Sequence, residues 1–147
     1  MIATTITGKI GEAMKAHDEV RLSTLRMLSS ALNYEQIAKQ HELTEEEELV
    51  VVRKEAKKRK DAIEAYTQAN APDRAAKEAA ELKILQEYLP AEMNDADLEK
   101  LVTEAIAQTG ATQMSDMGKV IGLVMGKAEG KADGSRVSAM VKAKLTA

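Results

Sequence analysis

The sequence predicts an all-α protein, and three features of its composition favour that class. Hydrophobic residues make up 44% of the 147 residues and charged residues 31%, which is typical of a globular chain. There is no Phe, no Trp and only three Tyr, so the core must be built from aliphatic residues and Met, which suit helix–helix packing. Two prolines interrupt the chain, and no alternation of apolar and polar residues is sustained.

The first two helices are predicted by apolar residues spaced three or four apart. One helix is expected from near Thr4 to Ala16, with its apolar stripe at Ile2, Ile6, Ile10 and Met14. Asp18 suits the N-cap of the next helix, because its carboxylate can accept a backbone N–H of the first turn. That second helix is expected to continue towards Ile37, and its stripe consists of Leu22, Leu25, Leu28 and Leu32.

The third helix has the clearest start signal. Thr44 followed by Glu47 is typical of a capping box, in which each side chain accepts a hydrogen bond from the other residue's backbone N–H. The acids from Glu45 to Glu48 also suit a helix N-terminus, where the helix dipole favours negative charge. This helix is expected from about Glu45 to Gln68, a length of roughly 36 Å.

A turn at residues 70–73 then leads into a fourth helix, with Pro72 entering it and Pro90 ending it. The segment from Pro90 to Asn94 is the best domain boundary, because one helix stops and another starts there. We therefore expect an N-terminal helical hairpin or bundle region over residues 1–90, and a small three-helix C-terminal bundle over residues 91–147.

Capping signals divide the C-terminal region into three helices. Asn94 or Asp95 suits the N-cap of the first, and Gly110 suits its C-terminal end. A second helix is expected over Ser115–Lys127, capped by Ser115, and a third over 134–145, capped by Asp133 or Ser135. Acids dominate the beginning of this region and lysines the rest, so its basic surface is expected to be local and C-terminal.

Several kinds of site are excluded. The chain has no cysteine, so disulfides, thiolate zinc sites and cysteine nucleophiles are absent. His17 and His41 lie in predicted loops without a paired Ser, Asp or second His, which argues against a catalytic triad or a metal site. No segment approaches the roughly 20 apolar residues of a membrane span. We therefore expect a cytoplasmic protein that holds no metal or cofactor and contacts no membrane.

The densest positive cluster lies in the predicted third helix. It wraps nearly all round a helix, and acids three or four residues away offer ion pairs, so a solvated helix and a phosphate-binding patch both fit. Arg59 falls in the apolar stripe between Ala56 and Ile63, where it must reach out or find a buried acid. The secondary basic patch consists of Arg53, Lys57, Lys58, Arg59 and Lys60.

The most unusual segment is Met117–Val137, in which a glycine recurs every four residues. On a helix, Met117, Val120 and Val124 share the core face. Beside that face lies a row of three glycines that runs round to Lys119, and we call it the glycine strip: Gly118, Gly122 and Gly126. Each glycine inside a helix costs about 0.8–1 kcal/mol relative to alanine, so the strip requires a compensating interaction.

Two compensations fit the glycine strip. Another helix can pack closely over it, or a ligand can approach the bare main chain there. A phosphate–sugar chain suits the second case, because lysines border the strip and a helix starts nearby. The candidate nucleic-acid-binding residues are Gly118, Lys119, Gly122, Gly126, Lys127, Gly130, Lys131, Asp133, Gly134, Ser135 and Arg136.

At these residues the sequence resembles the YqeY family, and the resemblance covers essentially the whole chain. It includes residues 21–23, 26–27, 58–62, 88–90 and 116–120. The segment from 122 to 134, GLVMGKAEGKADG, also resembles the tail domain of the B subunit of the tRNA-dependent amidotransferases, with matches at Gly122, Val124, Met125, Gly130, Lys131 and Ala132. Glu129 and Gly134 depart from that tail, which is usually more basic at the first position and has proline at the second.

The resemblance implies an accessory role in translation. In the amidotransferase, a carbon–nitrogen ligase with glutamine as amido donor, the tail recognises tRNA and the chemistry happens in other domains. We therefore expect a tRNA-binding or amidotransferase-associated accessory protein that is non-catalytic by itself, with tRNA, the amidotransferase or other translation components as partners.

Two other classes stay open. A protein-interaction module would receive a partner helix on the glycine strip and the C-terminal methionines, Met114, Met117, Met125 and Met140. An enzyme that acts alone would need an acid and a base brought together across helices, which spacing along the chain does not show.

Overall fold

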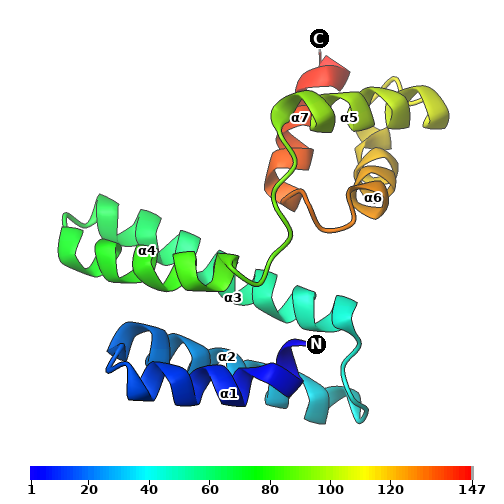
Figure 1. Cartoon of the computed structure of the whole chain (residues 1–147). Helices are drawn as coiled ribbons and strands as arrows, with labels where there is room; N and C mark the ends of the chain where they lie inside the picture. The colour runs from blue at the N-terminus through cyan, green and yellow to red at the C-terminus, as the bar shows by residue number, and fades with distance from the viewer. Residues whose placement is uncertain (147) are drawn as a thin grey trace. The chain divides into compact units, whose positions relative to one another are not determined.

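The computed structural model describes residues 1–146, which form two compact units, one over Met1–Leu89 and one that begins at Pro90 (Figure 1). The described residues contain seven α-helices and one short 3-10 turn, and no strand. The predicted all-α class is therefore confirmed. No helix within residues 1–146 has the length and apolar character needed to cross a membrane.

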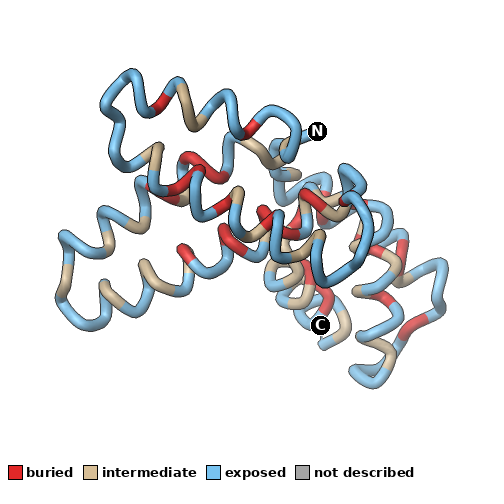
Figure 2. The backbone as a smooth tube through the Cα atoms, turned by 90° about the horizontal axis from the view of Figure 1, so that it is seen from below, coloured by how far each residue is buried: buried red, intermediate tan, exposed pale blue. Residues whose placement is uncertain are grey.

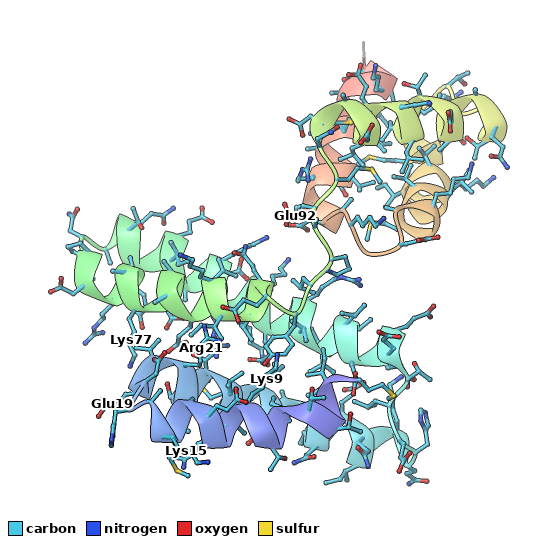
Figure 3. All side chains as sticks on the ribbon, viewed as in Figure 1. Lys9, Lys15, Glu19, Arg21, Lys77 and Glu92 are labelled. Atoms are coloured by element: carbon cyan, nitrogen blue, oxygen red, sulfur yellow. The ribbon has the colours of Figure 1, made fainter. Side chains whose placement is uncertain are left out.

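The first unit begins with two helices joined by a short turn, α1 (Ile2–Lys15) and α2 (Glu19–Lys39). Asp18 caps α2 as predicted, because its carboxylate accepts a hydrogen bond from the Arg21 N–H at 3.0 Å. The Arg21 guanidinium reaches the segment after α4 and donates to both carboxylate oxygens of Glu87, at 2.9 and 2.8 Å (Figure 3). This bidentate contact raises the pKa of Arg21 and lowers the pKa of Glu87.

The next two helices, α3 (Glu45–Gln68) and α4 (Pro72–Gln86), form an antiparallel pair (Figure 1). The predicted capping box is present. The Glu47 carboxylate accepts from the Thr44 N–H at 2.9 Å, and the Thr44 hydroxyl accepts from the Glu47 N–H at 3.3 Å. The backbone hydrogen bond from Thr44 and the side-chain contact with Lys39 lower the pKa of Glu47 to about 2.

The predicted end of α4 at Pro90 is wrong. The helix ends at Gln86, and the N–H groups of Glu87, Tyr88 and Leu89 then bond to carbonyls three residues back. These tighter bonds draw the chain into a 3-10 type turn before the proline is reached.

The core of the first unit lies where the four helices meet (Figure 2). Its central side chains are fully buried on the inward faces of α1, α2, α3 and α4: Ile6, Leu25, Leu28, Leu32, Val52 and Leu85. Glu48 lies in this interior with no exposed surface. Its carboxylate accepts from the N–H groups of Ile2 and Ala3, at 2.7 and 2.8 Å, and so caps α1.

The second unit contains α5 (Asp95–Thr109), the 3-10 turn η1 (Met114–Asp116), α6 (Met117–Ala128) and α7 (Gly134–Thr146). Asn94 caps α5 by accepting the Asp97 N–H at 2.8 Å, and Gly110 ends it in the left-handed region with a φ of 68°. Both were predicted.

Ser115 does not cap α6, contrary to the prediction. The Asp116 carboxylate accepts from the N–H groups of Thr112 and Gln113, at 3.2 and 3.3 Å, and holds the 3-10 turn that precedes the helix. The core of the second unit is almost wholly aliphatic: Leu98, Val102, Ala105, Val120, Val124, Ala128, Val137 and Val141.

Candidate nucleic-acid interface

The glycine strip lies on the outer side of α6. The helix buries Val120, Val124 and Ala128 against α5 and α7, while Gly118, Gly122 and Gly126 are exposed. A methyl group added at any of these three glycines would meet no other atom within 4 Å. Within the second unit, no other helix packs closely over the strip, so this compensation does not come from α5 or α7. The helix gives up the stability that alanine would provide and gains no packing in return.

The lysines predicted around the strip occupy different positions. On a helical projection of α6, Lys119 lies at the edge of the strip next to Gly126, whereas Lys127 lies further round on the same side, away from the strip and next to the buried Val120. The Lys127 ammonium donates to the Gln108 side chain of α5 at 3.0 Å. The Lys119 and Lys131 ammonium groups have no hydrogen-bond or ion-pair partner within residues 1–146.

The backbone of the loop between α6 and α7 is fixed by a sharp turn, a buried side chain and a hydrogen bond. Glu129 and Gly130 are both in the left-handed region, with φ of 49° and 77°, and turn the chain sharply after α6. Ala132 is buried in the core, and the Lys131 carbonyl accepts from the Met93 N–H at 2.6 Å. These contacts fix the backbone of Lys131 while its side chain points to solvent.

The start of α7 is already occupied by the protein's own charges. The Asp133 carboxylate accepts the Ser135 N–H at 3.0 Å, so a negative group sits where a phosphate was expected to bind beside Gly134. Arg136 donates to Asp95 at 2.7 Å and lies 3.7 Å from Glu92, which ties α7 to the start of α5. The start of α7 and Arg136 therefore stabilise the fold of the second unit, and they do not form a free cationic surface.

The secondary basic patch does not form one surface. Arg59 is 5% exposed, and its guanidinium donates to Glu55 at 2.8 Å and to Glu81 at 3.2 Å. Lys58 binds the other oxygen of Glu55 at 2.8 Å, Lys57 is exposed, and Arg53 and Lys60 are half-buried. The sequence allowed Arg59 either to reach solvent or to pair with a buried acid, and the structure shows the buried pairing. Of the remaining residues, Arg53, Lys57 and Lys60 are spaced four and three apart and share one side of α3, whereas Lys58 lies on another side.

Two buried acids were not identified from the sequence. Glu81 comes from α4 to neutralise Arg59, and Glu48 turns inward to cap α1, although the sequence grouped it only with the acids that suit the N-terminus of its own helix. A signal for both exists, because Glu48 and Glu81 fall at the same helical register as the core residues Val52 and Leu85. Within residues 1–146, no group of three or more His, Asp or Glu side chains is arranged to hold a metal ion.

The first unit also has a groove of about 240 Å³ between the start of α1 and the start of α3. The Lys9 ammonium lies 4.8 Å from the centre of the Tyr88 ring at its rim, a cation–π contact (Figure 3). Glu45 and Glu48 both line this groove, and the Glu48 carboxylate is already bound to two backbone N–H groups.

Comparison with known proteins gives a family match and two relatives. A family model described as Yqey-like protein matches residues 3–145. The chain is 34% identical over 114 residues to Altered inheritance of mitochondria protein 41, mitochondrial, from Vanderwaltozyma polyspora, which covers 72% of this chain and 61% of that protein. It is 32% identical over 89 residues to an uncharacterized protein of Schizosaccharomyces pombe, covering 60% of this chain and 72% of the relative. The chain thus spans about three fifths of the length of the first relative.

Proposed function

Because this chain belongs to the Yqey-like protein family over residues 3–145, we propose that it is an accessory protein that binds tRNA or acts beside a tRNA-dependent amidotransferase. In this proposal the protein is not catalytic by itself. It acts in the cytoplasm, on RNA or on the translation components that carry RNA.

The observation that carries the proposal is the open glycine strip beside Lys119. Bare main chain lets a phosphate–sugar backbone approach more closely than any side chain would allow. An unpaired ammonium at the edge of the strip supplies the charge that such a backbone seeks. Lys131, also unpaired and held on a fixed loop, is the second cation of this surface.

A partner helix is the weaker occupant for the same surface. Met117, Met125 and Met140 pack against the core of the second unit and are only partly exposed. Met114 alone among the four predicted methionines is substantially exposed, at 42%. A methionine-rich face of the kind that receives an apolar helix is therefore not assembled here.

The test is direct binding of the full chain to tRNA at two salt concentrations. We expect binding at about 50 mM salt that weakens steeply by about 200 mM, because each neutralised phosphate releases counterions. Lys119→Glu combined with Lys131→Glu should weaken binding at least tenfold and reduce the salt dependence.

Lys15→Glu is the matched control, because Lys15 is an exposed cation at the end of α1 in the other unit (Figure 3). It should leave tRNA affinity nearly unchanged. Absence of binding at about 50 mM salt, or equal loss in the control and the double variant, would show that this surface does not bind tRNA.

A further inference from the structure

The outward face of α2 carries a largely exposed apolar stripe, in which the Met27 sulfur accepts a hydrogen bond from the Arg59 guanidinium of α3 at 3.5 Å. Its large side chains are among the most exposed hydrophobic residues of the described chain: Val20 is 36% exposed, Met27 48%, Tyr34 76% and Ile37 76%. Ser23 and Ser30 lie between them and are also exposed. The inward face of the same helix is separately filled by Leu25, Leu28 and Leu32, which are fully buried.

The spacing along the stripe is that of a coiled-coil seam. Val20, Met27 and Tyr34 are seven residues apart, and each is followed three residues later by Ser23, Ser30 or Ile37. An alternating three-and-four repeat keeps these positions on one line of a helix that pairs with another helix. No charged residue interrupts the line, which extends for about five helical turns.

We propose that this stripe, Val20, Ser23, Met27, Ser30, Tyr34 and Ile37, pairs antiparallel with the same stripe of a second copy of the chain. Antiparallel pairing places each of Val20, Met27 and Tyr34 opposite one residue of the other set, Ser23, Ser30 and Ile37, in the second copy. Tyr34 then meets Ser23 of the second copy, Met27 meets Ser30, and Val20 meets Ile37. A large side chain faces a small one in the inner layers, so the helices can approach without overpacking.

The flanks of the stripe agree with this arrangement. On one side, Arg26 faces Asn33 of the second copy, and Glu19 faces Gln40, so no like charges oppose each other. On the other side, Thr24 is fully buried and Ala31 packs against the core of the same chain, so the exposed residue there is Ala38, which is uncharged. A two-fold axis at the middle of α2 relates the two copies, which makes the interface closed and self-complementary.

One helix face is a small interface, so the dimer should be weak, with a dissociation constant on the order of 10–100 µM. Sedimentation equilibrium of the full chain over a concentration series measures it. Ile37→Lys should weaken association tenfold or more, whereas association of the unmodified chain should change little with salt, because the contact is apolar.

Val50→Lys is the matched control, because Val50 is 51% exposed on α3 and lies outside the stripe. It should leave the dimer intact. Both side chains are largely exposed, so neither variant should unfold the protein, and circular dichroism verifies this. A chain that stays monomeric up to about 0.5 mM, or that Val50→Lys and Ile37→Lys affect equally, would overturn the proposal.

Cross-linking tests the register independently. The chain contains no cysteine, so introduced thiols report only on their own positions. A mixture of Met27→Cys and Ser30→Cys chains should form the mixed disulfide under mild oxidation, because antiparallel pairing brings these positions within bonding distance. Preferential disulfide formation by Met27→Cys chains alone would show parallel pairing and contradict the proposed register.

Discussion

Gly122→Ala should stabilise the second unit and weaken its proposed binding at the same time. Gly122 lies in the middle of α6, and an added methyl group meets no atom within 4 Å. The substitution therefore brings no clash, and it removes the cost of a glycine inside a helix. We expect a gain of about 0.8–1 kcal/mol in the free energy of unfolding of this unit.

Hydrogen exchange at Val120 and Val124 measures this gain within the full chain. Both residues are fully buried on α6, so their amides should report the opening of the second unit. A gain of about 0.8–1 kcal/mol corresponds to exchange roughly four- to fivefold slower. Tyrosine signals do not serve here, because the three tyrosines, Tyr34, Tyr66 and Tyr88, all lie in the first unit.

Gly8→Ala supplies the matched control. Gly8 lies inside α1, and an added methyl group there also meets nothing within 4 Å. It should stabilise the first unit by a similar amount and leave tRNA binding unchanged. Loss of stability on Gly122→Ala would refute the reading of an open strip, and unchanged tRNA affinity would refute close approach of a ligand to the main chain.

Three further substitutions test the interior of the first unit. Arg59→Met should lower the free energy of unfolding by about 3–5 kcal/mol, because it strands two buried carboxylates, and urea unfolding followed by tyrosine absorbance measures it; a loss below about 1 kcal/mol would mean that these acids are solvated. Glu48→Ala should cost about 1–3 kcal/mol and speed hydrogen exchange at Ile2 and Ala3, and unchanged exchange there would contradict the cap. Glu47 has a pKa of about 2, below its ordinary 4.5, so its contribution to stability is complete above about pH 4.5 and is lost as the pH falls towards 2. The stability difference between the unmodified chain and Glu47→Gln should therefore shrink from pH 7 to pH 3, and a constant difference would show that Glu47 is not the titrating group.

Features set by neighbouring residues were well predicted from the sequence. The cap of Asp18, the capping box at Thr44, the entry of Pro72 into α4 and the left-handed turn at Gly110 all depend on groups within a few residues. The end of α4 and the start of α6 were missed, because a 3-10 turn at each place satisfies the backbone before the expected signal is reached.

Contacts between distant residues could not be predicted in the same way. Arg136 binds Asp95, which is 41 residues away, and Glu48 caps a helix start 46 residues away. The helical pattern specifies which face each side chain occupies, but not which partner lies opposite it. The glycine strip was found from its spacing, yet only the structure shows that no other helix of the second unit covers it.

Arg59 joins three helices through one side chain. It extends from α3, binds Glu81 of α4, and donates at 3.5 Å to the sulfur of Met27 on α2. The contacts point in different directions, because the N–H donors of the planar guanidinium are fixed relative to one another. Lysine would keep the positive charge but could not span the same three directions. At this position the geometry of the cation, and not its sign alone, limits which residues the fold tolerates.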